Sequence, residues 1–190
     1  MRELVWEQAL GSKTRLTSAL YHYRIDDYYR NWDYAYDGDG NWIGYKGLYG
    51  KQSSKGMEIE IEHLWDSGVR LRSSYARQDT RDENGQTPVN TPRHIAKLNL
   101  SAPLAGELLR AGLAVRYLGR RLDQQRDYQS SALLADLTLT SKWNNWSGSL
   151  SVRNIGNTRY HEVSGALIND RGIYPADRRN IWLQLGYEFK

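Results

Sequence analysis

Residues 180–189, just before the C-terminal Lys190, alternate between two kinds of side chain. Every second position is apolar or aromatic, and the positions between them carry Asn, Trp, Gln, Gly and Glu. Because successive side chains of a β-strand point to opposite faces of a sheet, this period of two predicts a strand over 180–189 with one apolar face. The residues of that face are Ile181, Leu183, Leu185, Tyr187 and Phe189.

The same alternation recurs along the chain and predicts an all-β fold. The nine predicted strands are 3–10, 14–26, 57–62, 69–75, 96–101, 110–117, 133–143, 146–156 and 180–189. Tight turns at 11–13, 66–68, 104–107 and 144–145 alternate with longer polar loops at 27–50, 79–93, 122–131 and 160–178. Neighbouring strands are therefore expected to pair as antiparallel hairpins in one meander. Short turns at one end and long loops at the other are typical of an outer-membrane β-barrel.

A membrane barrel also explains how so polar a chain can have an apolar face. Mean hydropathy is −0.74, and no stretch approaches the roughly 20 apolar residues of a membrane helix. In a barrel only every second residue faces lipid. Trp and Tyr, which number 7 and 14 beside a single Phe, suit boundaries that are apolar on one side and wet on the other. The alternative is a soluble β-sandwich binding module, in which a second sheet would cover the apolar face.

The number of strands indicates a part of something larger. Closing nine antiparallel strands would set the first and the last parallel, whereas bacterial single-chain barrels use even numbers. An open sheet would instead expose two edges that invite aggregation. The first eight residues contain no apolar region of a signal peptide, which an outer-membrane protein needs for secretion. We therefore expect one piece of a larger barrel whose start lies elsewhere.

Four stretches resemble the C-terminal barrel of TonB-dependent receptors. Residues 54–60 (Ser-Lys-Gly-Met-Glu-Ile-Glu) are similar to the family's small-x-Gly-apolar-Glu-x-Glu strand. Residues 90–98, which begin Asn-Thr-Pro-Arg-His, resemble its Asn-x-Pro-Arg-His loop leading into a strand. Residues 150–160 resemble its apolar-x-Val-x-Asn-Leu-x-Asp-x-x-Tyr strand, with two departures. The fourth stretch is the terminal strand, preceded at 175–179 by Pro-Ala-Asp-Arg-Arg where the family usually has Pro-Gly-Arg.

The resemblance covers essentially the whole chain in the family's order and implies a fold and a function. Members hold an N-terminal plug inside a barrel of about 22 strands. By this resemblance, residues 1–190 are the C-terminal portion of the barrel, a large antiparallel transmembrane sheet, with plug and signal peptide absent. The implied function is energised import of a scarce nutrient, such as a ferric siderophore, across the outer membrane of a Gram-negative bacterium.

The resemblance also implies partners. TonB and the plug would act with this chain only through the missing N-terminal part. The last strand resembles the signal read by the barrel-assembly machinery, carried by the five apolar residues of the 180–189 strand. The machinery and outer-membrane lipid are therefore expected partners.

The sequence has no pattern of catalysis or cofactor binding. No nucleophile, base and acid stand together in a motif, so we expect no enzyme activity and no cofactor. The four histidines are dispersed without metal-ligand spacing. Residues 37–41 resemble the start of a calcium loop but continue with Trp42 where Gly is required. The basic residues behind the net charge of +4 are scattered, so we expect no nucleic-acid partner.

The expected ligand site lies in the loops at the outer mouth. The 27–50 loop is rich in aromatic side chains, some of which should anchor the barrel at the lipid interface while others could stack on a ligand. Basic residues of other outer loops could attract an anionic chelate. The residues singled out are Trp32, Tyr34, Tyr36, Trp42, Arg126, Arg171 and Arg178.

Overall fold

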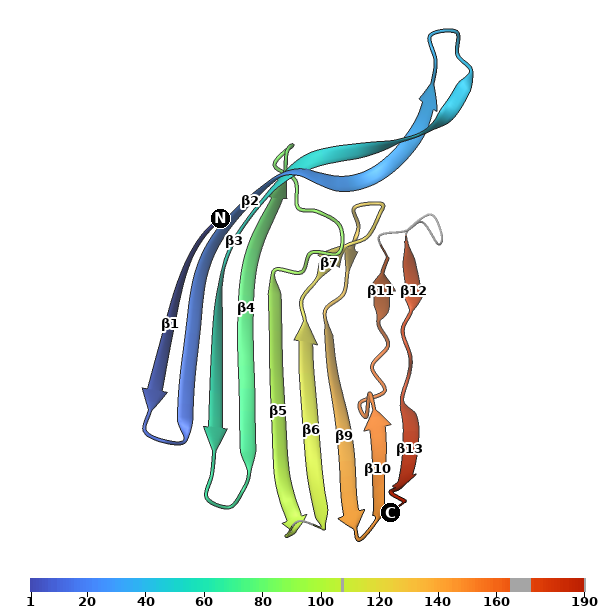
Figure 1. Cartoon of the computed structure of the whole chain (residues 1–190). Helices are drawn as coiled ribbons and strands as arrows, with labels where there is room; N and C mark the ends of the chain where they lie inside the picture. The colour runs from blue at the N-terminus through green and yellow to red at the C-terminus, as the bar shows by residue number, and fades with distance from the viewer. Residues whose placement is uncertain (107, 165–171, 190) are drawn as a thin grey trace.

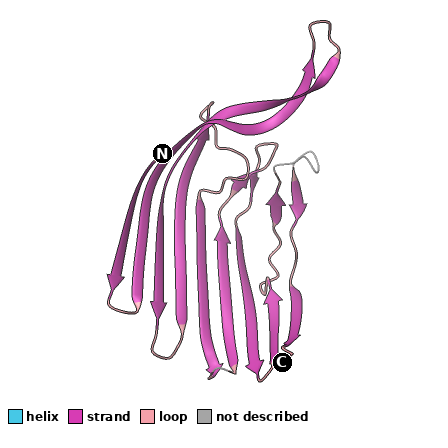
Figure 2. Cartoon of the chain, in the orientation of Figure 1, coloured by secondary structure: helices cyan, strands magenta, loops and turns pink. Residues whose placement is uncertain are grey.

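The computed structural model contains one large sheet and two small hairpins (Figure 1). It describes residues 1–106, 108–164 and 172–189, without the side chains of 29–32 and 48–49. Within these residues all regular secondary structure is β-strand (Figure 2). No helix among them is long and apolar enough to cross a membrane. The all-β prediction is confirmed.

Nine strands of the large sheet pair in the order β1-β2-β3-β4-β5-β6-β9-β10-β13, each antiparallel to its neighbour. They are β1 (Arg2–Leu10), β2 (Thr14–Tyr36), β3 (Trp42–Leu64), β4 (Arg70–Asp82), β5 (His94–Ala105), β6 (Leu109–Leu118), β9 (Ala132–Trp143), β10 (Trp146–Arg153) and β13 (Asn180–Tyr187). The small hairpins are β7 (Arg121–Leu122) with β8 (Tyr128–Gln129) and β11 (His161–Val163) with β12 (Ile173–Pro175). The predicted antiparallel meander of nine strands is confirmed, and Figure 1 shows its short turns together at the lower end.

The large sheet has one apolar and one polar face. The cross-strand register places apolar residues opposite apolar residues, so that rows of them run across several strands. One such row contains Leu71, Leu100, Leu113, Leu137, Val152 and Ile181. Among the described residues no second sheet packs on this face, and Ile181, Leu183 and Leu185 are each 68% exposed. The soluble-sandwich alternative is therefore wrong.

Aromatic side chains mark both ends of the apolar face. At the short-turn end, the ring of Tyr187 lies 4.9 Å from that of Trp146 and 4.8 Å from that of Phe189. At the opposite end, Tyr75 Oη lies 2.7 Å from His94 Nδ1. Transmembrane barrels have an apolar band bordered by aromatic girdles at both interfaces. The outward face of this sheet has the same layout.

Residues 27–50 form a hairpin arm, and the prediction of a polar loop there is wrong. β2 and β3 continue through them to a turn at 37–41, and Figure 1 shows the arm rising above the rest of the sheet. Three register shifts interrupt the pairing between positions 25 and 36, and Asp27 has a φ of 62°. Each shift moves the following side chains to the other face. The period of two is thereby lost from the sequence although the strands continue.

Strand ends also differ from the prediction where the backbone turns. The expected loops 122–131 and 160–178 contain parts of the β7–β8 and β11–β12 hairpins. β10 ends at Arg153, before the predicted end at 156, because Asn154 adopts a left-handed φ of 49°. β13 ends at Tyr187, so Phe189 of the predicted strand lies just beyond it.

Three outer turns share one five-residue geometry. In each, the first N–H donates to the fifth carbonyl, and the fourth N–H donates to the first carbonyl. The first residue is an aspartate whose carboxylate accepts from the third and fifth N–H groups, an arrangement that suits Asp in turns. The aspartates are Asp37, Asp82 and Asp123, and the fourth residues are Gly40, Gly85 and Arg126, with φ of 83°, 74° and 71°.

Gly56 in β3 is required by close packing, which predicts an intolerance that can be measured. A Cβ at this position would lie 2.5 Å from the carbonyl oxygen of Arg77, and backbone cannot easily move away. Gly56→Ala should lower the free energy of unfolding by about 1–3 kcal/mol, the usual cost of overpacking.

The matched control is Gly112→Ala in β6, where the nearest atom to a new Cβ is Thr138 O at 3.9 Å. Denaturant unfolding of the full-length protein in detergent, followed by Trp fluorescence, measures both variants. Equal stability of the two variants would contradict the close-packing account.

Candidate ligand site at the outer mouth

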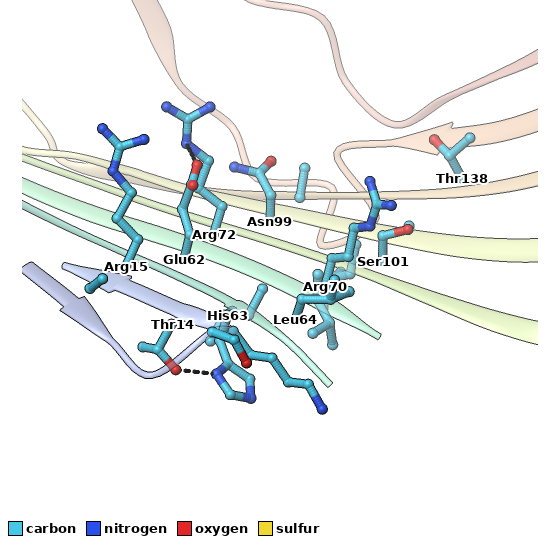
Figure 3. A pocket seen from close by; sticks show the side chains of 18 of the residues that line it. Thr14, Arg15, Glu62, His63, Leu64, Arg70, Arg72, Asn99, Ser101 and Thr138 are labelled. Carbon is cyan, nitrogen blue, oxygen red and sulfur yellow. Dashed lines mark hydrogen bonds and ion pairs between the residues drawn. The ribbon is translucent and has the colours of Figure 1, made fainter. Parts of the chain in front are cut away.

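The polar face carries a lattice of ion pairs at its short-turn end. Arg72 Nε lies 3.0 Å from Glu60 Oε2 and 3.3 Å from Glu62 Oε1, and Arg15 Nη2 lies 2.8 Å from Glu7 Oε1. All of these side chains except Glu60 border a hollow of about 1030 Å³, part of which Figure 3 shows with Arg15, Glu62 and Arg72 on one side of the sheet. The face is therefore charged, and the ion pairs neutralise part of that charge locally.

A second hollow on the polar face, of about 390 Å³, lies nearer the outer end. Its walls include the acidic residues Asp136 and Asp177 and the cations Lys97, Arg116 and Arg153. Among the described residues, these three cations form no ion pair within 4.0 Å. The guanidinium of Arg153 stacks 4.8 Å from the ring of Trp182. Three cations and two carboxylates thus line this hollow.

The outer connections of three hairpins pack together above these hollows. We call the described residues of three segments the outer cap. These segments follow β4, β6 and β10 and comprise residues 83–93, 119–131 and 154–179. Most of the buried side chains among the described residues lie in the cap or at its base. They are Arg121, Leu122, Asp123, Ala132, Leu134, Asn154 and Val163. The packed core of the chain therefore sits at the outer end of the sheet.

Arg121 is at the centre of the outer cap. Its side chain is 1% exposed, its Nη2 donates to the carbonyl oxygen of His161, and the same atom lies 3.7 Å from Glu162 Oε2. Nε and Nη1 have no hydrogen-bond partner among the described residues. Burial lowers the pKa of Arg121, and the Glu162 carboxylate opposes that shift. Because a buried charge is costly unless paired, removing either partner should loosen the cap.

Asn90 joins all three connections of the outer cap. Its backbone N–H donates to Leu122 O at 2.9 Å, and its side-chain Nδ2 donates to Val163 O at 2.9 Å. Its φ of 54° is left-handed, a conformation that Asn tolerates better than most residues. Nearby, burial raises the pKa of the Tyr160 hydroxyl, with the Glu162 charge acting in the same direction. The cap is thus a packed polar unit and not a set of separate loops.

The hairpin arm presents aromatic rings in pairs. The Tyr34 and Tyr45 rings lie 5.6 Å apart, and Trp42 meets Tyr45 edge-on at 5.7 Å. Tyr34, Tyr36 and Trp42 are about half exposed. At the tip, hydrogen bonds from Asn41 lower the pKa of the Asp37 carboxyl. The acidic residues that resemble a calcium loop therefore serve a tight turn.

The structure keeps the predicted ligand residues on separate elements. Tyr34, Tyr36 and Trp42 share the arm, and Trp32 pairs with Gly47 in its backbone ladder. Arg126 takes the left-handed position of a cap turn, and its Nη1 donates to Thr87 O at 2.8 Å. Arg178 Nε donates to Asn157 Oδ1 at 3.0 Å, and Arg171 lies outside the described residues. The two described arginines thus hold the cap together, and neither of them lines any of the four hollows on the described part of the sheet.

Sequence reasoning missed Arg121 and the positioning role of Asn90 and Asn154. The Asn154 side chain accepts from Thr158 N and donates to Thr158 O and Asp177 O, so it ties the end of β10 to the segment before β13. The motifs at 90–98 and 150–160 contained a usable signal for Asn90 and Asn154, because Asn is enriched among the non-Gly residues that adopt a positive φ. No sequence signal marks a buried arginine.

The outer cap generates a prediction about Arg121. Arg121→Gln removes the cation that bonds His161 O and pairs with Glu162, so backbone amides at 87–90 and 161–164 should exchange hydrogen faster, on the order of tenfold. Hydrogen exchange of the full-length protein in detergent, read by mass spectrometry, measures this change. The control is Arg120→Gln, because Arg120 is exposed and contacts only the Tyr128 ring at 5.0 Å in the described contacts. Identical exchange rates in the two variants would contradict the claim that Arg121 stabilises the outer cap.

Comparison with known proteins gives the same architecture. The family described as TonB dependent receptor-like, beta-barrel, matches residues 3–155. No curated protein matches the chain. Among solved structures, the ferric-catecholate import receptor Fiu from E. coli K12 is 22% identical, with a TM-score of 0.71 over 98% of this chain and 27% of its own. The ferripyoverdine receptor of the outer membrane of Pseudomonas aeruginosa is 18% identical, with a TM-score of 0.71 over 98% of this chain and 27% of its own.

A third similar structure, the copper transporter OprC, is 13% identical, with a TM-score of 0.73 over 98% of this chain and 30% of its own. At such identities the likeness concerns the fold, and the chain spans little more than a quarter of the length of the Fiu and ferripyoverdine receptors. The family match covers most of the chain. Residues 3–155 carry the receptor-barrel pattern, and the chain belongs to the TonB-dependent receptor-like β-barrel family.

Proposed function

We propose that this chain forms part of the barrel wall of an outer-membrane receptor that imports a scarce nutrient, such as a ferric siderophore. The observation that carries the proposal is a single sheet with an uncovered apolar face and a charged opposite face. An uncovered apolar surface of this size is costly in water and favourable in lipid. Two proteins of similar structure are a ferric-catecholate import receptor and a ferripyoverdine receptor, which supports the class of cargo, whereas a third is a copper transporter.

In this proposal the chain lies in the outer membrane of a Gram-negative bacterium, and residues 1–190 are the C-terminal portion of the barrel. Its apolar face contacts outer-membrane lipid. The five apolar residues of the 180–189 segment serve as the signal for the barrel-assembly machinery. Four of them are exposed on edge strand β13 or just beyond it at well over half of their area, as such recognition requires.

The charged face would line the lumen and meet the plug. Ion pairs at the short-turn end keep the wall hydrated, which suits a plug that must move when TonB pulls on it. The chain's own part is binding and passage, and we assign it no catalytic step. Cargo would first meet the aromatic arm and the basic residues of the outer loops.

Membrane placement predicts that a charge is tolerated on one face only. Leu137 lies in the middle of an apolar row, and Thr138 is its neighbour on the polar face, with its hydroxyl 2.9 Å from Ser151 Oγ. Leu137→Arg should cost about 2–4 kcal/mol at the bilayer midplane, whereas Thr138→Arg should cost far less. The readout is the amount of heat-modifiable full-length protein in the outer-membrane fraction. A sheet facing water on both sides would give the reverse order or no difference.

Ligand capture by the arm predicts a loss of uptake. Replacing Tyr34 and Trp42 by Ala should lower uptake on the order of tenfold, because two exposed stacking surfaces disappear. The assay follows TonB-dependent entry of radioactive iron, offered as hydroxamate, catecholate or hydroxycarboxylate chelates, into iron-starved cells. Tyr128→Ala, an exposed tyrosine of the outer cap, is the control. Unchanged uptake of every chelate that the unaltered protein imports would exclude the arm from capture.

A further inference from the structure

Charged residues on the outward face of the sheet gather in one place. On β5, β6, β9, β10 and β13 the residues sharing a face with Ile181 include no Asp, Glu, Lys or Arg. On β1 to β4, below the arm, the charged residues of this face all lie at the outer end. They are Arg2, Arg24, Asp26, Lys51, Lys55, Arg77, Asp79 and Arg81.

The register places Arg2 and Lys55 one row beyond the apolar residues, and Arg77 in the last apolar row. Arg2 pairs with His22, His22 with Lys55, and Lys55 with Asp79, so that one polar row crosses four strands. The next row toward the short turns contains Leu4, Leu20, Met57 and Arg77. Neighbouring strands are about 4.8 Å apart, so Arg2 and Lys55 lie within reach of one bulky headgroup.

A hollow of about 790 Å³ lies over both rows. Residues that line it include Arg2, Leu4, Leu20, Lys55, Met57, Arg77, Asp79, Arg81 and Arg93. Asp79 orients two of the cations, since its Oδ1 lies 2.9 Å from Arg81 Nη2 and 3.6 Å from Arg93 Nη2. The other three cations are exposed and have no ion pair among the described residues. Five positively charged residues thus line the hollow beside an apolar floor, against two acidic residues, Asp79 and Glu3.

We propose that this hollow binds the phosphate-bearing headgroup of a lipid of the outer leaflet. Lys and Arg form strong charge-assisted hydrogen bonds with phosphate oxygens. Leu4, Leu20 and Met57 would contact the upper part of the acyl chains. Soluble cargo in the lumen would not meet this hollow, because its cations lie on the face opposite Glu58 and Glu60. The inference rests on the proposed membrane placement, and it adds a specific anionic lipid site to it.

The test measures lipid retained by the full-length protein in detergent, by native mass spectrometry. The probes are a hexa-acylated diphosphorylated glucosamine disaccharide lipid, the same lipid without phosphates, and inorganic phosphate. The test variant combines Arg2→Gln, Lys55→Gln and Arg77→Gln. The control variant removes the same charge from the polar face by Arg15→Gln, Arg70→Gln and Lys142→Gln.

The unaltered protein and the control should retain the diphosphorylated lipid, and the test variant should bind it at least about tenfold more weakly. Equal retention of the dephosphorylated lipid, or equal retention by the test variant, would overturn the site. Full displacement by millimolar inorganic phosphate would overturn the choice of a lipid. Outer-membrane fractionation and heat-modifiable migration are recorded in parallel. Failure there overturns the membrane placement together with the site, whereas correct insertion without phosphate selectivity overturns the site alone.

Discussion

The structure depends on the backbone hydrogen bonds between neighbouring strands. In a lipid environment no water is available to satisfy N–H and C=O groups, so each must bond within the protein. The nine-strand ladder does this for its inner strands without help from a packed core. Side chains are then free to divide between lipid and water, and their period of two follows from the pleat. The edges of β1 and β13 need the same satisfaction from further strands.

Because backbone hydrogen bonds hold the sheet and its side chains face lipid or water, the tertiary core lies elsewhere in the chain. A single sheet has no second layer to bury side chains against, so most of it stays exposed on both faces. Packing appears where backbone leaves the ladder, in the outer cap, because irregular connections must satisfy their own polar groups. The side chains of Arg121, Asp123 and Asn154 are buried there and bond mainly to the backbone of other residues. The sheet thus satisfies its backbone polar groups by strand pairing, and the cap does so by packing and side-chain hydrogen bonds.

The sequence predicts the strands of the large sheet and their faces because odd and even positions of a strand point to opposite faces. The prediction fails where register shifts interrupt this alternation. In the arm, three such shifts remove the period of two from the sequence of two long strands. It also fails for Arg121, whose partner His161 is 40 residues away and leaves no local pattern. The outer-loop arginines were singled out for their charge. Of these, Arg126 and Arg178 form bonds inside the cap, which composition cannot distinguish from ligand binding.

The most direct test is the accessibility of consecutive positions along β9. Residues 1–190 contain no cysteine. Single cysteines can therefore be introduced from 133 to 143 in the full-length protein, with any cysteine outside 1–190 replaced by Ser, and spin-labelled in lipid bilayers. Collision with oxygen and with a water-soluble nickel chelate reports lipid and water at each position. The account predicts a period of two, with oxygen dominant at 135, 137 and 139 and nickel dominant at 136, 138 and 140. Uniform nickel accessibility, or a pattern without alternation, would contradict a sheet that has lipid on one face and water on the other.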